Sequence, residues 1–537
     1  MLSSLLAATV LLAAGCGGGD SEVESEATPA RGGNLRIAVL EPDSIDPSRS
    51  SHRTGLLVLK QLCDTLVAFD PYTGDLVPGI AETWTPSPDM KKFTFKIRSG
   101  VKFHNGRDVT AEDFVYSLSR FASKTAGSSE YFLLELVLGY QDLRLEKAPA
   151  LAGVRAIDAA TLEIELTEPF AEFPAVLAHP AAGSAVPKEE VDKGPEIFAQ
   201  NPVCTGPYKM VGAWEQGKDL TLQRVEGYQP PKGVDAGGYS KQIIFRPVPD
   251  AKAGYTLLGK GTVEISGVPL DDLVTARKTE GRVESGPNGI LAYIGFPVTK
   301  APYDNVQLRL ALEAAIDRGA IINRLLAGTR RVPQGFLPPS TGTVGQASKC
   351  VRIGTGAQPD VAKKALKDAA IDPAATKPPL MFNDSDGNRR WLEEISSQWS
   401  KTLGIQAELR PAEWKAYLDS LTDPGADGPF RLAAIARYPS PEAILKPLFS
   451  TGSLDNFTRY SDPEFDKLMG EARSTAAVRA REGLYAKAAA RLCETMPIAP
   501  MWLDLNHLAF SSKVLWTGDK RLDLFGDPVL RRMGTQS

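Results

Sequence analysis

The chain has 537 residues, of which 43% are hydrophobic and 23% charged, and its formal net charge at pH 7 is −4. This balance excludes a strongly basic surface for nucleic acid and a polybasic stretch for membrane binding. The composition is that of a globular protein and the length exceeds one typical domain, so we expect two or three lobes with a large core.

The N-terminus carries an apolar run at residues 5–14, followed by Gly15 and Cys16. This pattern is typical of a lipoprotein signal, in which the cysteine is diacylated and becomes the new N-terminus after cleavage. The run is shorter than the about 20 residues that span a bilayer. Residues 1–4 contain no Lys or Arg, which departs from the positive start of a signal peptide. We expect a signal at 1–16 with lipidation at Cys16; the alternative is an ordinary hydrophobic start with a chance cysteine.

Residues 17–33 read GGGDSEVESEATPARGG. Small and acidic residues without any aromatic side chain cannot form a core, so this segment predicts a flexible tether. The globular part is expected to begin near residue 34.

Two kinds of local pattern predict the first elements of the globular part. Alternating apolar and polar residues predict strands at 92–98 and 161–166 and another around Leu220 and Leu222. The sequence Thr110-Ala111-Glu112-Asp113 resembles a capping box and predicts a helix over 111–121.

The second half of the chain contains two further helix signals. Asp304 is a candidate N-cap for a long helix that ends near Gly328. The sequence SDPE at 461–464 predicts the start of another helix, whose buried stripe is formed by Phe465, Leu468, Met469 and Ala472. Helices and strands alternate throughout, which favours an α/β or α+β fold over a helical bundle or a β-sandwich.

The motifs of common catalytic sites are missing from the sequence. The four histidines, at positions 52, 104, 179 and 507, are scattered without a metal-binding spacing, and no GxSxG motif is present. Two segments that approach a phosphate loop, 212–218 and 254–260, lack the Ser or Thr that would hold magnesium. The sequence therefore favours binding without chemistry, and we expect no enzymatic activity, metal or cofactor.

Four cysteines remain besides Cys16: Cys63, Cys204, Cys350 and Cys493. In an oxidising compartment they could form two disulfides, with three possible connectivities. The alternative is that they are free buried thiols.

Four separated blocks occur in a characteristic order: 81–114 with RSGVKFHNG at 98–106, 205–224 with TGPYK at 205–209, 303–339 with YDNVQLRLAL at 303–312, and 460–500 with YSDPEFD at 460–466. Together they resemble the solute-binding components of peptide-type ABC importers, family 5 of the bacterial extracellular solute-binding proteins. The similarity extends over nearly all of the chain beyond the tether.

The resemblance implies a two-lobed α/β clamp of the type-II periplasmic-binding class, with an extra domain in the first lobe. Residues 34–294 and the C-terminal return at 502–537 would form lobe I, and residues 295–501 would form lobe II. Ligand would bind in the cleft between the lobes, which close about a hinge, and the closed form would dock on a membrane permease powered by cytoplasmic ATPases.

One position departs from the pattern of the family. In peptide-binding relatives, a carboxylate in an Ala-Asp-Tyr-x-x-Pro segment pairs with the amino group of the peptide. Here the segment begins Ala436-Arg437-Tyr438. A guanidinium at this point would repel an ammonium and favour a carboxylate, a phosphate or sugar hydroxyls. The alternative is that Arg437 points to solvent or pairs with a local acid, and that a peptide binds through backbone contacts.

Other candidate ligand contacts are implied only by their place in the chain. Ser44 and Ile45 belong to a segment, 41–46, that approaches the ligand in relatives. Tyr131 and Phe132 follow a small-residue stretch in the first lobe, and Trp391 and Trp414 could offer flat stacking surfaces in the second. Each of these aromatic residues could instead belong to the core.

Family topology also suggests a disulfide pairing. It assigns Cys63 and Cys204 to lobe I and Cys350 and Cys493 to lobe II. We therefore expect the bonds Cys63–Cys204 and Cys350–Cys493, because a bond across the cleft would oppose closure.

The resulting functional hypothesis is a monomeric, lipid-anchored receptor on the extracytoplasmic face of the cell membrane, which binds a peptide or peptide-like solute for an ABC permease. One alternative is the same fold with an anionic, opine-like, oligosaccharide or metal-chelate ligand. Less favoured alternatives are a surface signalling lipoprotein and a tethered hydrolase.

Overall fold

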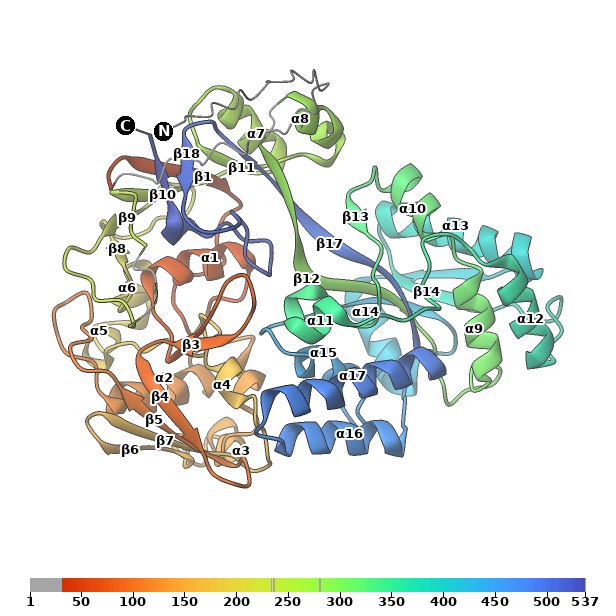
Figure 1. Ribbon diagram of the computed structural model, residues 1–537, viewed down its shortest axis with the longest axis horizontal. Coiled ribbons are helices and arrows are strands. Elements are labelled where there is room, and N and C mark those ends of the chain that lie inside the picture. Colours follow the sequence, from red (N-terminus) through yellow and green to blue (C-terminus); the bar gives the residue numbers. More distant parts are fainter. Residues whose placement is uncertain (1–30, 233, 235–236, 280–281, 537) are drawn as a thin grey trace, which may run out of the picture.

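The computed structural model of the protein describes residues 31–232, 234, 237–279 and 282–536, so the predicted signal at 1–16, Cys16 and most of the predicted tether lie outside the described residues. The chain folds into two lobes joined by two long strands, β12 (Val283–Gly295) and β17 (Ile498–Phe510) (Figure 1). The two-lobed α/β architecture predicted from the sequence is thus confirmed. Within the described ranges, no helix has both the length and the apolar character needed to cross a membrane.

A mixed sheet runs through both lobes, in the order β15-β14-β16-β12-β17-β11-β1-β10-β9-β8, with β13 also paired to β17. β12 pairs with β16 through Ile290–Gly295, and β17 pairs with β11 through its last residues. Each long strand therefore begins in one lobe and ends in the other. The other strands of this sheet are β1 (Asn34–Val39), β8 (Tyr208–Met210), β9 (Leu220–Arg224), β10 (Gln242–Pro247), β11 (Ile265–Gly267), β13 (Arg330–Arg331), β14 (Pro379–Asn383), β15 (Glu408–Ala412) and β16 (Phe430–Ile435).

Lobe I is built on the β1 half of this sheet. Its core packs α1 (Arg53–Leu62) against β1, β9 and β10 through side chains such as Leu59, Leu222 and Phe245. The chain returns to this lobe through its last residues. The remaining elements here are β2 (Val67–Phe69), β3 (Leu76–Pro78), α5 (Lys188–Val191), α6 (Pro195–Gln200), α7 (Ala251–Gly259), α8 (Leu273–Thr279), β18 (Val514–Trp516) and β19 (Met533–Thr535).

The extra domain of lobe I is a separate four-stranded sheet in the order β4-β5-β7-β6, covered by helix α2. Its core contains Phe93, Phe95 and Phe114. The elements are β4 (Ala81–Pro86), β5 (Lys92–Ile97), β6 (Val154–Asp158), β7 (Thr161–Glu165), α2 (Ala111–Ala122), α3 (Tyr140–Arg144) and α4 (Phe173–Val176). Two lobe II side chains, Tyr438 and Ala443, also pack into this core.

Lobe II has its own core, in which helices cover the β14–β16 half of the sheet. Trp399 is fully buried there, and its indole N–H donates to the carbonyl of Leu312. The helices are α9 (Val306–Ala314), α10 (Arg318–Leu325), α11 (Thr343–Ala347), α12 (Pro359–Ala369), α13 (Asp386–Leu403), α14 (Trp414–Ser420), α15 (Glu442–Phe449), α16 (Pro463–Ser474) and α17 (Val478–Thr495).

Most local predictions are confirmed. The three predicted strands correspond to β5, β7 and β9, and the predicted helix over 111–121 is α2. The capping box is formed, because the Asp113 carboxylate accepts hydrogen bonds from the backbone N–H of Thr110 at 2.8 Å and from its hydroxyl at 3.1 Å.

The single long helix predicted from Asp304 to Gly328 is wrong. The structure has two helices, α9 and α10. Asn305, not Asp304, caps the first by accepting from the N–H of Gln307. Asp317 caps the second by accepting from the N–H of Ala320, which starts a new helix where the sequence pattern suggested continuation.

The predicted helix after Ser461 is α16, and its buried stripe is the one expected from the sequence. Its N-cap, Asp462, accepts from the N–H groups of Glu464 and Phe465 at 3.0 and 3.2 Å, and from Arg491 at 2.8 Å. Burial opposes ionisation of Asp462, but these hydrogen bonds outweigh it and lower the pKa of the carboxyl.

Replacing the cap, Asp462→Ala, is expected to lower the free energy of unfolding by about 1–2 kcal/mol at neutral pH. Because the folded pKa of Asp462 is depressed, the contribution of its carboxylate is present above the unfolded pKa and disappears as the pH falls through the folded value. Urea unfolding across the acid range measures this. Asp462→Asn keeps an acceptor without the charge and is the matched control; a loss from Asp462→Ala that does not shrink in acid would contradict the assignment.

The four cysteines form two bonds, Cys63–Cys204 and Cys350–Cys493, with Cα–Cα separations of 4.9 and 5.6 Å. This is the pairing that the family topology implies. The first bond lies within lobe I and the second within lobe II, so neither crosses the cleft.

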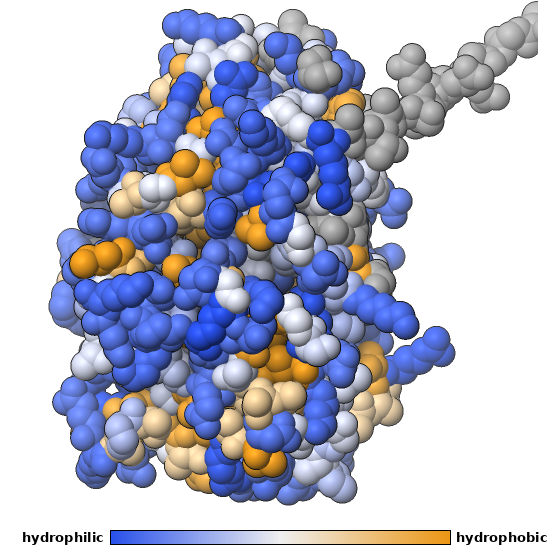
Figure 2. Space-filling view, turned by 90° about the vertical axis from the view of Figure 1, so that its left-hand side faces the viewer, coloured by the Kyte–Doolittle hydropathy of each residue, from blue (hydrophilic) through white to orange (hydrophobic). Residues whose placement is uncertain are grey.

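The face of lobe I that points away from lobe II is mostly hydrophilic, with apolar residues in small separate groups (Figure 2). Exposed large apolar side chains such as Ile197 and Val211 occur singly in this lobe, which is normal for a protein surface.

Candidate functional site

A pocket of about 290 Å³ lies between the lobes, and we call it the cleft pocket. Lobe I contributes α1 and the residues before it, and lobe II contributes residues 435–438, which follow β16. The crossing strands contribute Asn288, Ile290 and Asn506. A solute in this pocket therefore contacts both lobes and both connections between them.

Arg437, which lines the cleft pocket, forms an ion pair that joins the two lobes. The Nη1 of Arg437 lies 2.6 Å from Oε1 of Glu130, which belongs to the extra domain. The side chain of Glu130 is only 3% exposed, whereas that of Arg437 is 32% exposed. Burial raises the pKa of Glu130, and Asp43 adds to this effect while Arg437 opposes it. Arg437 thus has a local acidic partner in this conformation.

His179 lies behind this pair. Its Nε2 is 3.6 Å from Oε2 of Glu130, and its Nδ1 accepts from the N–H of Ala181. Burial, helped by the positive charges of Arg437 and Lys60, lowers the pKa of His179 to about 3. The ring is therefore neutral at physiological pH, and it contributes a polar but uncharged surface to the cleft pocket.

Negative charge also surrounds Arg437 on the lobe II side. Partial desolvation raises the pKa of the Asp455 carboxyl, an effect that Glu135 strengthens and Arg437 weakens. The guanidinium of Arg437 is thus balanced by acids from both lobes.

The opposite wall of the cleft pocket contains a second charged cluster. The Nζ of Lys60 lies 2.8 Å from Asp523 and 2.7 Å from Asp527, and Arg53 lies 2.7 Å from Asp527. Burial alone would lower the pKa of Lys60, but the two carboxylates reverse this and raise it. These charges are paired with one another and leave no free cation in the cluster.

Four ion pairs join the extra domain to lobe II, and in each of them the acid belongs to the extra domain and the base to lobe II. α16 and α17 lie next to the extra domain on this side (Figure 1). The pairs are Glu130–Arg437 at 2.6 Å, Glu135–Lys446 at 3.3 Å, Glu168–Arg473 at 3.0 Å and Glu172–Arg481 at 3.4 Å. The backbone N–H of Ala171 also donates to the carbonyl of Arg473. Lobe II is therefore held at the extra domain as well as at the crossing strands.

Comparison with known proteins identifies the family. Residues 75–456 match the model of the bacterial extracellular solute-binding proteins, family 5. The chain belongs to this family. It is 29% identical over 518 residues to the periplasmic oligopeptide-binding protein OppA of Salmonella typhimurium, covering 94% of this chain and 92% of that protein. It is also 29% identical over 474 residues to the periplasmic murein peptide-binding protein MppA of Escherichia coli, covering 87% and 86% of the two chains.

Two solved structures of MppA share the fold of this chain and match it to different degrees. The unliganded open form of MppA superimposes with a TM-score of 0.83, at 26% identity and covering 95% of this chain and 99% of that one. A second structure of the E. coli MppA, with the same identity and coverage, has a TM-score of 0.69. The arrangement described above therefore resembles an open, unliganded receptor.

The predicted segment of this family 5 protein around Arg437 lines the cleft pocket. Ala436, Arg437 and Tyr438 all contribute to its wall. Ala436 is 3% exposed and its N–H donates to the carbonyl of Gly289. The Tyr438 hydroxyl donates to Glu442, and the ring is mostly buried.

Among the other predicted contacts, three are buried in this conformation: Ser44, Ile45 and Trp391. Trp391 is 2% exposed and packs edge-to-face against Trp502 at 4.8 Å, so it belongs to the lobe II core. Ile45 is fully buried in the lobe I core, and the hydroxyl of its neighbour Ser44 accepts from the N–H of Asp46. Ligand contact by these side chains therefore stays a prediction that this conformation does not support, because each is covered by its own lobe.

The remaining predicted aromatic residues are accessible but do not line the cleft pocket. The Tyr131 ring is covered by the guanidinium of Arg144, and Phe132 is 42% exposed beside it. Trp414 is 49% exposed on α14 and packs against Tyr417. Sequence reasoning missed Glu130, His179 and Lys60. Glu130 directly precedes Tyr131, but nothing in the sequence links it to Arg437.

Within the described ranges, no group of three or more His, Cys, Asp or Glu side chains is arranged to hold a metal ion. The cleft pocket offers a solute hydrogen-bonding side chains, balanced charges and apolar surface from Phe69, Ile290 and Phe525.

Proposed function

We propose that this protein is an extracytoplasmic receptor of an ABC importer, which binds a peptide or peptide-like solute in the cleft pocket and delivers it to a membrane permease. The observation that carries the proposal is that residues of both lobes and both crossing strands line this pocket. A solute that contacts both lobes favours the closed form by its differential contacts, and hinge closure needs no covalent step. The names of the relatives, oligopeptide-binding and murein peptide-binding proteins, support a peptide-like solute class.

The ion pair of Arg437 bears on the charge of the solute. A simple anion would compete with Glu130 for the guanidinium and leave a buried carboxylate without its partner, at a cost of about 1–3 kcal/mol. A solute with both donors and acceptors avoids this cost. The second candidate, an anionic non-peptide solute, is favoured by the partial exposure of Arg437, which leaves one face of the guanidinium accessible.

The remaining features of the proposal come from the sequence. Residues 34–294 and 502–537 form lobe I and residues 295–501 form lobe II. The protein is a monomer without enzymatic activity, anchored by lipid at Cys16 to the outer face of the cell membrane. Ser44, Tyr131, Phe132 and Trp414 approach the solute only if closure moves them to the cleft.

Native mass spectrometry of protein purified without denaturation tests the solute class. We expect an additional mass that fragments into amino-acid residues and that is lost on denaturation. Arg437→Asp should then retain peptide, because an acid replaces the base beside Glu130 and an ammonium is still accepted. Recovery of a sugar or a phosphate ester, lost in the Arg437→Asp variant, would favour the anionic alternative instead.

Lipid anchoring is tested separately at Cys16. Expressed in a bacterial host that processes lipoproteins, the natural chain is expected in the membrane fraction with a diacylated N-terminal cysteine. Cys16→Ser should release it, because the thioether to the lipid cannot form. Equal membrane association of both chains would contradict the anchor.

A further inference from the structure

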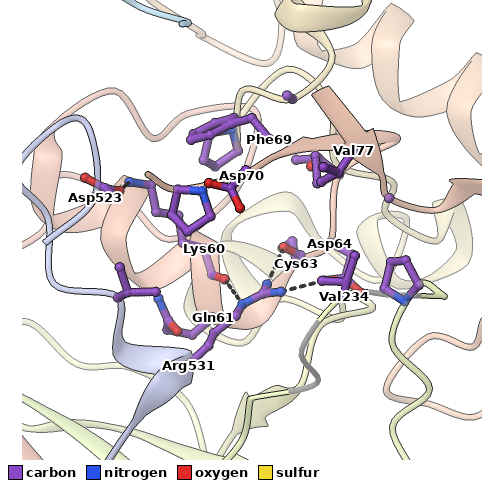
Figure 3. Close-up of a pocket in the computed structure, with 18 of the residues that line it drawn as sticks. Lys60, Gln61, Cys63, Asp64, Phe69, Asp70, Val77, Val234, Asp523 and Arg531 are labelled. Atoms are coloured by element: carbon purple, nitrogen blue, oxygen red, sulfur yellow. Dashed lines mark hydrogen bonds and ion pairs between the residues drawn. The ribbon is translucent and has the colours of Figure 1, made fainter. Parts of the chain in front are cut away.

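Lobe I contains a pocket of about 250 Å³ that is distinct from the cleft pocket, and we call it the lobe I pocket. It lies between the end of α1, the hairpin β2–β3 and the C-terminal residues (Figure 3). Phe69 and Val77 of the hairpin lie across it from Arg531 (Figure 3). An apolar cavity of about 150 Å³ holds a benzene molecule, so this pocket has room for an aromatic side chain.

The lobe I pocket adjoins the cleft pocket. Lys60, Phe69 and Pro180 line both. The ring of Phe69 packs edge-to-face against Phe525 of the cleft pocket at 6.0 Å, and the Nζ of Lys60 lies 5.9 Å from the same ring. The two pockets are therefore separated by a single layer of side chains. A group that passes from the cleft into the lobe I pocket would have to displace these shared side chains.

The wall of the lobe I pocket does not favour a charged occupant. Asp64 is paired with Arg531 at 2.9 Å and accepts from the Tyr228 hydroxyl at 2.8 Å. Lys60 is paired with Asp523 as described above. Much of the rest of the wall is apolar, from Val77, Pro180 and Pro528 among others. A neutral, largely apolar group fits this surface, because Asp64 and Lys60 already have partners of opposite charge.

One polar atom near the wall lacks a partner. Gln61 also lines the lobe I pocket and is 2% exposed. Its side-chain nitrogen donates to the carbonyl of Leu57, but its Oε1 is buried without a hydrogen bond. A buried acceptor without a donor is destabilising, and an occupant with an O–H or N–H group would satisfy it if the amide turned its oxygen towards the pocket.

We propose that the lobe I pocket is a specificity subsite that receives an aromatic side chain with a hydrogen-bond donor, tyrosine or tryptophan, from the solute in the cleft. The inference rests on the proposed function and deepens it, because it selects among peptide-like solutes. The ring fills the space beyond Phe69, and its O–H or N–H donates to Oε1 of Gln61.

Isothermal titration calorimetry with a tripeptide series tests the inference. The series contains Ala-Ala-Ala and the six tripeptides in which one alanine is replaced by tyrosine or phenylalanine. At one position we expect tyrosine to bind about tenfold or more tightly than alanine, because a large ring is buried. Phenylalanine at that position should bind less tightly than tyrosine, since it lacks the donor.

Three variants locate the preference. Val77→Trp fills the lobe I pocket and is expected to abolish the ratio of tyrosine to alanine affinity. Gln61→Met is expected to bring tyrosine down to the level of phenylalanine. Val211→Trp, at an exposed position outside both pockets, is the matched control and should keep the full ratio. Thermal unfolding of each variant confirms that it is folded.

The possible results distinguish a failure of the subsite from a failure of the proposed function. A tyrosine preference that survives Val77→Trp, or no preference at any position, overturns the subsite while peptide binding stands. Loss of binding to every peptide in the series, with the natural protein folded, overturns the proposed function and the subsite with it.

Discussion

Removing the lobe II disulfide by the double substitution Cys350→Ala and Cys493→Ala is expected to lower the free energy of unfolding of lobe II by about 2–5 kcal/mol. The two cysteines are 143 residues apart, and the loop that they close contains helices α12–α16 and strands β14–β16. Without the bond, the unfolded chain of this lobe gains conformational entropy, and in the chain-entropy model the gain grows with loop length. The effect is large because one bond constrains most of the lobe.

The bond Cys63–Cys204 provides an independent comparison. It closes a loop of similar length, with a sequence separation of 141, and that loop contains the whole extra domain. Because the two bonds lie in different lobes, the effects of removing them should be additive to within about 0.5 kcal/mol. Differential scanning calorimetry of the two double variants, and of both combined, measures this.

Non-reducing peptide mapping is the control for these variants. It should recover Cys63 joined to Cys204 and Cys350 joined to Cys493. Unchanged unfolding temperatures in the presence of a reductant that demonstrably breaks both bonds would contradict the expected stabilisation.

The parts of the fold that the sequence predicts well are those encoded by local patterns. Gly100 and Gly106 have φ values of +77° and +91°, so the turn between them favours glycine. At Gly206 a Cβ atom would lie 2.7 Å from the backbone of Leu62, which explains a glycine beside the end of α1. A positive φ or a close contact between two backbone segments restricts a single position to glycine. Such restrictions produce a motif that can be recognised in the sequence.

The failed helix prediction has a local cause as well. The apolar stripe of α9 continues in register towards α10, so periodicity alone favours one helix. The Asp317 side chain competes for the backbone by capping the second helix. An aspartate can lie on the surface of a continuous helix or cap the start of a new one. The sequence alone does not distinguish these two roles, and tertiary packing decides between them.

The cleft itself could not be predicted in the same way. Glu130 and Arg437 are 307 residues apart in sequence, and each lies in a loop without periodicity. The two tryptophans illustrate the same limit, because Trp391 is 2% exposed and Trp414 is 49% exposed although both lie on helices of lobe II. Charge pairing and exposure at such positions depend on how the lobes are placed, which no short segment encodes.

Replacing Arg437 by methionine is expected to destabilise the protein by about 1–3 kcal/mol near pH 8, and by less near pH 5. The substitution leaves the carboxylate of Glu130 without its guanidinium partner in a site where the side chain is 3% exposed. The expected penalty is below that for a fully buried pair, because the Arg437 side chain is 32% exposed and solvent screens part of the interaction.

The sign of the pH dependence follows from Glu130. Burial already raises its pKa in the folded protein, and Arg437 opposes that shift. Without Arg437 the folded pKa rises further above the unfolded value. A carboxyl with a raised folded pKa stabilises the protein most below its unfolded pKa, and this stability is lost as the pH rises through the folded pKa. The cost of Arg437→Met therefore increases with pH.

The double variant Glu130→Gln with Arg437→Met separates the buried charge from the contact. It removes the carboxylate as well as its partner, so it should regain most of the stability that Arg437→Met loses near pH 8, and its remaining penalty should not depend on pH in this range. Urea unfolding at the two pH values measures all three chains. An equal penalty for Arg437→Met at both values would mean that Glu130 is not the group that Arg437 neutralises, and the guanidinium would then be free to contact an anionic solute.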